Sequence, residues 1–195
     1  MRQRRDALQA LHSLAYRQSG YFTAAQAVDV GFSYQAQKYH VDHGNWIRVE
    51  RGIFRLCDWP PAIDDVYVLW TLWSRGRGVI SHATALAVHD VGVLDPGKVT
   101  MTVPAGFSAK HPAVRTVHRD LPGGDVEQRE GFRVTTPLRT LLDVAASENQ
   151  ESVDDAVAEA LERGLVTAAA LVRRADELGD RAALRIERAL GAARA

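Results

Sequence analysis

The sequence predicts an α+β protein, in which an N-terminal winged helix-turn-helix is followed by a mixed α+β domain with a helical C-terminal tail. Three observations support this prediction. Residues 1–56 follow the order helix, helix, short turn, helix and β-hairpin. Residues 99–135 contain short alternating segments typical of strands, and residues 152–193 have the composition and spacing of helices.

The first helix is predicted by the spacing of its leucines. Leu8, Leu11 and Leu14 recur every three residues, which places them on one face of a helix over residues 6–17. Gly20 follows, and glycine is typical of the position just after a helix ends. The segment therefore supplies one amphipathic helix.

Capping signals define the second and third helices. Thr23 and Gln26 have the spacing of a capping box, so a helix begins at Thr23 and ends near Gly31. Ser33 is a favoured N-cap residue for a third helix over residues 34–43. The short turn between these two helices has the length and the glycine that a helix-turn-helix requires.

A hairpin and a proline-rich segment follow the third helix. The β-prone runs 46–50 and 53–56 are separated by Arg51 and a glycine, which predicts a tight hairpin, the wing. Residues 57–62 contain two consecutive prolines that prevent a helix from continuing. We therefore predict three parts: a DNA-binding domain over residues 1–56, a linker over 57–62 and an α+β domain over 63–195.

The second domain alternates between predicted helices and strands. Alternation of apolar and polar residues predicts its strands, and proline at a first helical position marks one helix start. The predicted helices cover residues 64–74, 81–89, 137–146 and, with breaks near 164–167 and 179, 152–193; the predicted strands cover residues 99–103, 114–118 and 132–135.

Charge is distributed unevenly between the two parts. The whole chain has 24 Lys+Arg and 24 Asp+Glu, but residues 1–56 contain 8 basic and 4 acidic side chains. The remaining residues contain 16 basic and 20 acidic side chains. A basic N-terminal part is consistent with nucleic acid as a partner, and an acidic second part with a basic protein.

Composition excludes several classes of protein. No apolar run is long enough to span a membrane, and the N-terminal residues lack the apolar core of a signal peptide. A single cysteine, Cys57, excludes an intramolecular disulfide and a cysteine-built zinc site. We therefore expect a reduced, cytoplasmic protein with no membrane partner.

The third helix and the wing are the candidate DNA-binding elements. A recognition helix places its N-terminal residues at base edges in the major groove, where Gln pairs with adenine and Lys contacts guanine or phosphate. Tyr39 and Val41 are expected in the core instead. An alternative interpretation is a solvated face on a winged helix that binds protein rather than DNA. The candidate contact residues are Ser33, Tyr34, Gln35, Gln37, Lys38, Arg48 and Arg51.

Metal, cofactor and catalytic sites are not expected. His82 and His89 share a helix face but lack a third ligand nearby, so His82 is interpreted as a structural hydrogen-bonding residue. The segment Gly92–Lys98 is similar to a phosphate-binding loop, but Val99 stands where a Ser or Thr should follow the lysine. No lysine has an acidic residue two positions before it, as nucleases of the restriction type commonly need. The sequence therefore predicts a protein that is not an enzyme.

Four segments in a fixed order resemble one known family. They are Gly20-Tyr21-Phe22-Thr23-Ala24; Gly44-Asn45-Trp46 through Val49 with Arg51-Gly52-Ile53-Phe54-Arg55; Ser81-His82-x-Thr84-Ala85-Leu86; and Thr136-Pro137-x-Arg139-Thr140-Leu141-x-Asp143. Over residues 5–150 the chain resembles the AbiEi-type antitoxins of type IV, abortive-infection toxin–antitoxin pairs.

The resemblance implies a function for each part. Family members carry an N-terminal winged helix that binds operator DNA and represses their own operon. Their C-terminal domain counteracts a toxin, usually one resembling a nucleotidyltransferase. The resemblance thus implies an antitoxin with a role in phage defence, with operator DNA and a cognate toxin as partners. The alternative remains a winged-helix regulator or interaction module without a toxin.

Overall fold

The computed structural model describes residues 2–92 and 97–193. Contacts divide the chain into two compact units. The first comprises Met1–Gly76 with Glu130–Phe132, and the second comprises Arg77–Arg129 with Arg133–Ala195. Residues 93–96, within the segment compared above with a phosphate-binding loop, lie outside the described residues.

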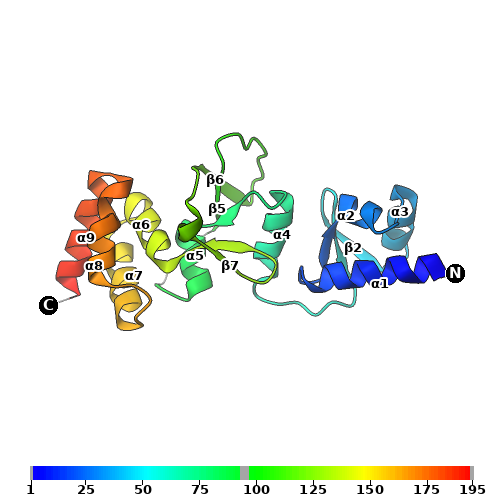
Figure 1. The fold of residues 1–195 in the computed structure, drawn as a ribbon, viewed down its shortest axis with the longest axis horizontal. Coiled ribbons are helices and arrows are strands. Elements are labelled where there is room, and N and C mark those ends of the chain that lie inside the picture. Colours follow the sequence, from blue (N-terminus) through cyan, green and yellow to red (C-terminus); the bar gives the residue numbers. More distant parts are fainter. Residues whose placement is uncertain (1, 93–96, 194–195) are drawn as a thin grey trace. The chain divides into compact units, whose positions relative to one another are not determined.

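The first unit contains the element order of a winged helix (Figure 1). A three-stranded antiparallel sheet in the order β1-β3-β2 lies beside the helices. The predicted limits of the hairpin strands are confirmed, and a short additional strand, β1, completes the sheet. The elements are α1 (Arg2–Tyr16), β1 (Tyr21–Thr23), α2 (Ala24–Asp29), α3 (Tyr34–Asp42), β2 (Trp46–Glu50), β3 (Ile53–Leu56) and α4 (Asp65–Trp73).

An aromatic cluster forms the core of the winged helix. The rings of Phe22 and Trp46 meet edge-to-face with centroids 4.8 Å apart, and Phe32 meets the same indole at 5.2 Å. Such geometry aligns a positive ring edge with a negative ring face. Leu11 brings α1 onto this cluster. Burial of these side chains fixes α1, the sheet and the helix-turn-helix as one body.

Helix α4 belongs to the first unit. Arg55 on β3 forms an ion pair with Asp65 at the start of α4, with Nη2 and Oδ2 3.2 Å apart. The same carboxylate oxygen accepts a hydrogen bond from the backbone N–H of Ala62 at 3.0 Å. Phe132 packs its ring against Tyr67 of this helix. The segment 57–62, predicted as an interdomain linker, therefore lies inside the first unit.

The second unit is built on a five-stranded mixed sheet. Its strand order is β6-β5-β4-β8-β7; β5 pairs with β6 and β4 with β8 in parallel, whereas β4–β5 and β7–β8 are antiparallel. The sequence did not predict β4 or β7. The sheet elements and their connecting helices are β4 (Val79–Ile80), α5 (His82–His89), β5 (Val99–Val103), β6 (Val114–His118), η1 (Gly123–Asp125), β7 (Val126–Gln128) and β8 (Arg133–Thr135).

Helices complete the second unit. Thr136, Asn149 and Thr167 each cap a helix by accepting a backbone hydrogen bond through the side chain. Leu142, Leu171 and other fully buried side chains form one apolar core between these helices. The structure confirms the breaks that were predicted in the helical tail near residues 164–167 and 179. The elements are α6 (Pro137–Ser147), α7 (Gln150–Glu162), α8 (Ala168–Ala175), η2 (Asp176–Leu178) and α9 (Asp180–Ala192).

Candidate nucleic-acid interface

The exposed face of α3 presents polar side chains at its N-terminal end. Ser33 caps the helix, since its Oγ accepts a hydrogen bond from the N–H of Ala36 at 3.2 Å. Tyr34 follows with 71% of its surface exposed, and Gln35 and Lys38 are exposed beside it. These side chains are free of the aromatic core and are able to meet a groove of DNA.

Lys38 forms an ion pair with a neighbouring carboxylate. Its Nζ lies 2.6 Å from Oδ2 of Asp42, one turn further along α3, and both side chains are exposed. An exposed pair of this kind contributes little to stability and opens at small cost. A phosphate or base contact by Lys38 would therefore compete with Asp42.

Gln37 does not belong to the exposed face, which corrects one predicted contact. Its side chain is only 3% exposed. Its Nε2 donates hydrogen bonds to the carbonyl oxygens of Ala24 at 3.0 Å and Phe32 at 3.1 Å. Gln37 thus ties α3 to the start of α2 and to the turn, and it is not available to a base edge.

Tyr39 also differs from the prediction. It was expected in the core, but it is 49% exposed and stacks on the ring of His43 with centroids 3.8 Å apart. Val41 does pack against the core. His40 stacks on Trp46 with an interplanar angle of 12°, so an imidazole ring completes the aromatic cluster at this position.

The wing carries two exposed arginines. The guanidinium of Arg48 lies over the ring of Phe54, 5.5 Å from its centroid, which holds the side chain against β3. Arg51 is at the hairpin tip, followed by Gly52 with a φ of 72° that a side chain would disfavour. The wing therefore presents one guanidinium held against the sheet and one at the turn.

Buried ion pairs organise the second unit. Arg139 on α6 is 4% exposed; its Nε donates to Asp143 at 3.0 Å and its Nη1 to Asp125 at 3.1 Å. Arg174 on α8 donates to the other oxygen of Asp125 at 2.6 Å. Hydrogen bonds from Arg174 and Arg139 lower the pKa of Asp125, against the opposing effect of burial. This network joins η1, α6 and α8.

Two buried histidines have structural partners. Nδ1 of His82 is 2.9 Å from Oγ of Ser81, and Nε2 of His89 is 2.7 Å from the carbonyl oxygen of Thr135. Burial lowers the pKa of both imidazoles. His82 thus has the hydrogen-bonding environment that the sequence predicts. Among the described side chains, no three His, Cys, Asp or Glu residues are grouped to hold a metal ion.

The second unit matches a known domain. A family model described as the AbiEi antitoxin C-terminal domain matches residues 79–192, which run from the first residue of β4 to the last residue of α9. The chain belongs to the AbiEi antitoxin family. The AbiEi match extends beyond residue 150, where the motif resemblance ended, and so includes the helical tail.

The fold has a counterpart among solved structures. The crystal structure of the RV2827C protein from Mycobacterium tuberculosis matches with a TM-score of 0.63, covering 96% of this chain and 76% of that chain. The sequences are 16% identical, so the likeness concerns the fold alone. No curated protein matches this AbiEi family member. Of the helices described, none is long and apolar enough to cross a membrane.

Proposed function

We propose that this AbiEi protein is an antitoxin that binds its operator through the winged helix, represses its own operon and counteracts a nucleotidyltransferase-like toxin. The observation that supports the antitoxin role is the AbiEi domain itself, which spans β4 to α9. The observation that supports DNA binding is the exposed polar end of α3 beside a wing with two arginines.

The exposed side chains divide by the contact each is suited to make. Gln35 is the proposed base-reading residue, because an amide pairs with the N6 and N7 atoms of adenine in the major groove. Tyr34, Ser33 and Lys38 surround it on the same helix end. Arg48 and Arg51 are suited to phosphates, which fix the position of a protein on DNA without reading sequence.

The second unit offers an acidic surface to a toxin. Glu151, Asp155 and Glu162 are exposed on α7. A toxin that acts on nucleotides or RNA needs a basic surface for its substrate, and exposed carboxylates complement such a surface. We place toxin recognition in the AbiEi domain and operator recognition in the winged helix.

The DNA half of the proposal is tested by electrophoretic shift with the full chain. Binding to its own upstream region should exceed binding to a random duplex and weaken steeply with salt, by about 0.9 in log K per unit of log salt for each phosphate contact. Equal binding to both duplexes at low salt would show that the protein is not an operator-specific repressor.

The toxin half is tested by co-expression with the neighbouring toxin, read as growth, beside a promoter reporter. Full-chain variants serve better than fragments cut at residue 62, because that cut would separate Arg55 from Asp65. Arg48→Ala/Arg51→Ala should derepress the promoter and still rescue growth. Glu151→Lys/Asp155→Lys should repress and fail to rescue. If the wing variant alone lost rescue, the winged helix would itself take part in neutralisation.

A further inference from the structure

One edge of the AbiEi sheet is built from segments without acidic residues. The edge strand β6, its neighbour β5 and the loop between them lie within residues 97–119, which contain no Asp or Glu. Residues 77–89, which contain β4 and α5, have none either. The same two segments carry exposed cations, namely Arg77, Lys98, Lys110, Arg115 and Arg119.

Three of these cations lie on one face of the sheet. β5 and β6 are parallel and pair Thr100 with Arg115, so the side chains of these two residues point to the same face. Alternation along each chain segment adds Lys98, two residues before Thr100, and Arg119, four residues after Arg115. The row is about 20 Å long between its outer Cα atoms. We call Lys98, Arg115 and Arg119 the basic strip.

The charge of the basic strip is not neutralised by the described residues. Its side chains are exposed, and none forms an ion pair with a described side chain. Asp120 follows the strip, and Glu148 acts on the pKa of His82 as Arg115 does, so it lies in the same region. Glu148 is half-buried and accepts a hydrogen bond from the hydroxyl of Ser147 at 3.2 Å. The strip therefore remains available to an anion.

The backbone of β6 has an open edge beside the basic strip. The N–H of Arg119 donates to the carbonyl oxygen of Val103 at 2.9 Å, which turns this residue toward β5. Backbone groups alternate in direction along a parallel ladder, so Thr116 and His118 turn theirs away from β5. No described strand lies on that side, because β6 is the edge of the sheet. The edge thus offers N–H donors and C=O acceptors beside three cations.

We propose that the basic strip and the open edge of β6 bind single-stranded RNA. The cations contact phosphates of one chain, which hold it in place without reading its sequence. The backbone groups of the edge bond to 2′-hydroxyl groups, which both donate and accept and which DNA lacks. A duplex fits less well, because a major groove admits a helix or a two-stranded ribbon, whereas β5 covers one side of β6.

The site predicts weak binding without sequence preference. Phe107 is the one Phe, Tyr or Trp within residues 97–119, and it is 4% exposed beneath the guanidinium of Arg77. No ring of this segment is therefore free to stack on a base, and affinity depends on phosphate contacts that salt weakens. The inference goes beyond the proposed function and requires neither operator binding nor toxin neutralisation.

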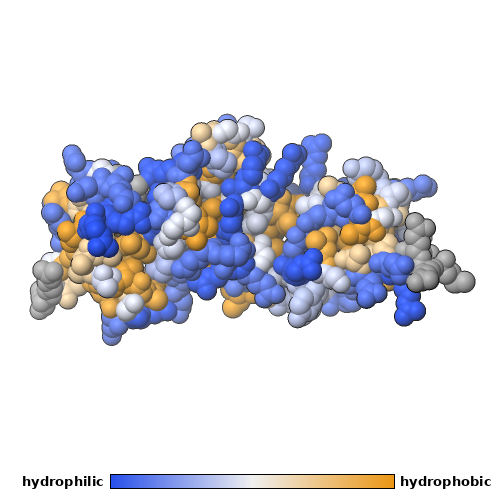
Figure 2. Space-filling view, in the orientation of Figure 1, coloured by the Kyte–Doolittle hydropathy of each residue, from blue (hydrophilic) through white to orange (hydrophobic). Residues whose placement is uncertain are grey.

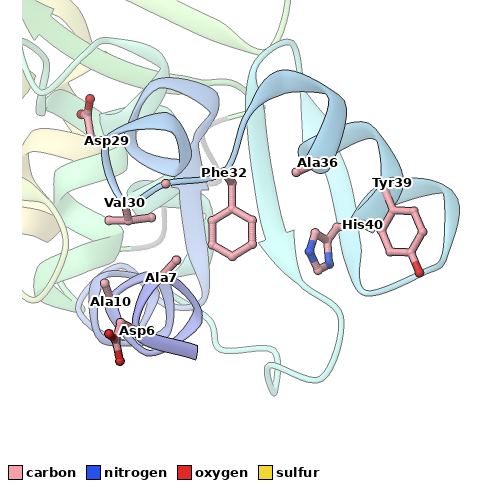
Figure 3. Close-up of a pocket in the computed structure, with 10 residues that line it drawn as sticks. Asp6, Ala7, Ala10, Asp29, Val30, Phe32, Ala36, Tyr39 and His40 are labelled. Carbon is pink, nitrogen blue, oxygen red and sulfur yellow. The ribbon is translucent and has the colours of Figure 1, made fainter. Parts of the chain in front are cut away.

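A groove on the winged helix has the opposite character. It lies between α1, the end of α2 and α3, with Phe32 in its centre (Figure 3). Hydrophobic surface is visible over these helices in the space-filling view (Figure 2). The carboxylates of Asp6 and Asp29 lie on one side of it (Figure 3). Apolar and acidic side chains disfavour a phosphate chain, so RNA is not expected to bind in this groove.

The test is fluorescence anisotropy at low salt with a labelled, unstructured RNA of about 12 nucleotides, a length within the range of single-strand sites. The full chain carries Arg48→Ala/Arg51→Ala, which removes the arginines of the wing. It should bind this RNA more tightly than single-stranded DNA of the same sequence. Three phosphate contacts should lower log K by about 2 per unit of log salt, at about 0.7 for each contact.

Variants of the basic strip should weaken RNA binding in this background. Arg115→Gln/Arg119→Gln should lower affinity at low salt by about tenfold or more and the salt slope by about 1.4, and Lys98→Gln should lower the slope by about 0.7. The matched control Arg173→Gln/Arg188→Gln removes two exposed cations from α8 and α9 and should bind RNA like the background.

Three results would overturn the proposal. They are equal RNA affinity with and without the Arg115→Gln/Arg119→Gln change, equal affinity for RNA and single-stranded DNA, and loss of RNA binding on the wing substitutions alone. The last result would place the RNA on the winged helix. Failure of the operator shift or of growth rescue would contradict the proposed function and leave these three measurements unchanged.

Discussion

The winged helix and the AbiEi domain use charged side chains in opposite ways. On α3 and the wing, Lys38, Arg48 and Arg51 are exposed, and the core beneath them is aromatic. In the AbiEi domain, Arg139 and Asp125 are buried together and connect three elements. The charges of α3 and the wing are therefore available to a partner, whereas those of the Arg139 network determine internal packing.

This difference assigns a role to part of the family motif. Arg139 and Asp143, four residues apart in the Thr136–Asp143 segment, form a buried pair on one face of α6. Their role in the structure is architectural, because neither reaches the surface. The proposed toxin-binding surface of the AbiEi domain therefore consists of other residues.

The largest expected effect comes from breaking the buried network. Arg139→Met should leave Asp143 buried without a cation, while Asp125 keeps Arg174, and lower the free energy of unfolding by about 3–5 kcal/mol. Urea unfolding monitored by circular dichroism measures this change in the free energy of unfolding. The four tryptophans, at positions 46, 59, 70 and 73, all lie in the first unit, so indole fluorescence reports the winged helix separately.

A matched substitution serves as the control for Arg139. Arg129→Met removes an exposed pair with Glu127 and should cost no more than about 1 kcal/mol. If the two variants were equally stable, the buried network would not be the element that holds the AbiEi domain together.

Gln37→Ala should destabilise the winged helix. The carbonyl oxygens of Ala24 and Phe32 would lose their amide donor, at a cost of about 1–3 kcal/mol. The indole fluorescence transition should move to lower urea, because Gln37 lies in the unit that contains every tryptophan. If the stability were unchanged and operator binding were impaired, Gln37 would instead belong to the DNA contact surface.

Gln35→Ala should show the opposite pattern. Gln35 is exposed, so its loss should leave stability within about 0.5 kcal/mol of the wild type. Operator affinity should fall by about 1–3 kcal/mol, with little change on random DNA. Equal losses on both duplexes would mean that the exposed end of α3 does not read the sequence.

Stability of the AbiEi domain should decrease as the pH falls through about 6.5, the ordinary pKa of histidine. Burial lowers the pKa of His82 and His89 in the folded state, so the unfolded chain takes up protons first. Each histidine contributes a slope of at most about 1.4 kcal/mol per pH unit. His89→Gln, which retains a donor for the Thr135 carbonyl, should reduce this slope, and an unchanged slope would exclude His89 as a source.

Arg51→Ala gives the smallest expected effect. Loss of one phosphate contact should weaken specific and random binding alike and lower the salt slope by about one. Fluorescence-detected binding over a salt series measures this slope. A loss confined to the operator would place Arg51 among the base-reading residues.

Local signals in the sequence predict most of the fold. Thr23, Ser33 and Pro137 mark helix starts that the structure confirms, and the alternation in β5 and β6 gives their limits. Strands β1, β4 and β7 are two or three residues long and were not predicted, whereas β8, also three residues long, lies within the predicted strand 132–135. β1 and β4 exist because distant segments pair with them, whereas β7 pairs with the neighbouring β8.

The same distinction explains which site residues could be predicted. Val41, which the sequence places in the core, lies four residues after Gln37, so the spacing already places Gln37 on the row that faces the core. That signal was available for Gln37. No local signal connects Arg139 to Asp125, or Arg55 to Asp65, because those pairs join elements that only the folded chain brings together.

The strand order of the AbiEi domain has a consequence for synthesis on the ribosome. β4 pairs with β8, which begins at Arg133, so one edge of β4 has no strand partner until more than fifty residues later in the chain. At roughly 5–20 residues per second that interval lasts several seconds. The sheet of the winged helix, by contrast, is complete once Leu56 has emerged. A chain terminated between Val103 and Arg133 has every strand of the winged-helix sheet and an open edge on β4 in the middle of the antitoxin sheet.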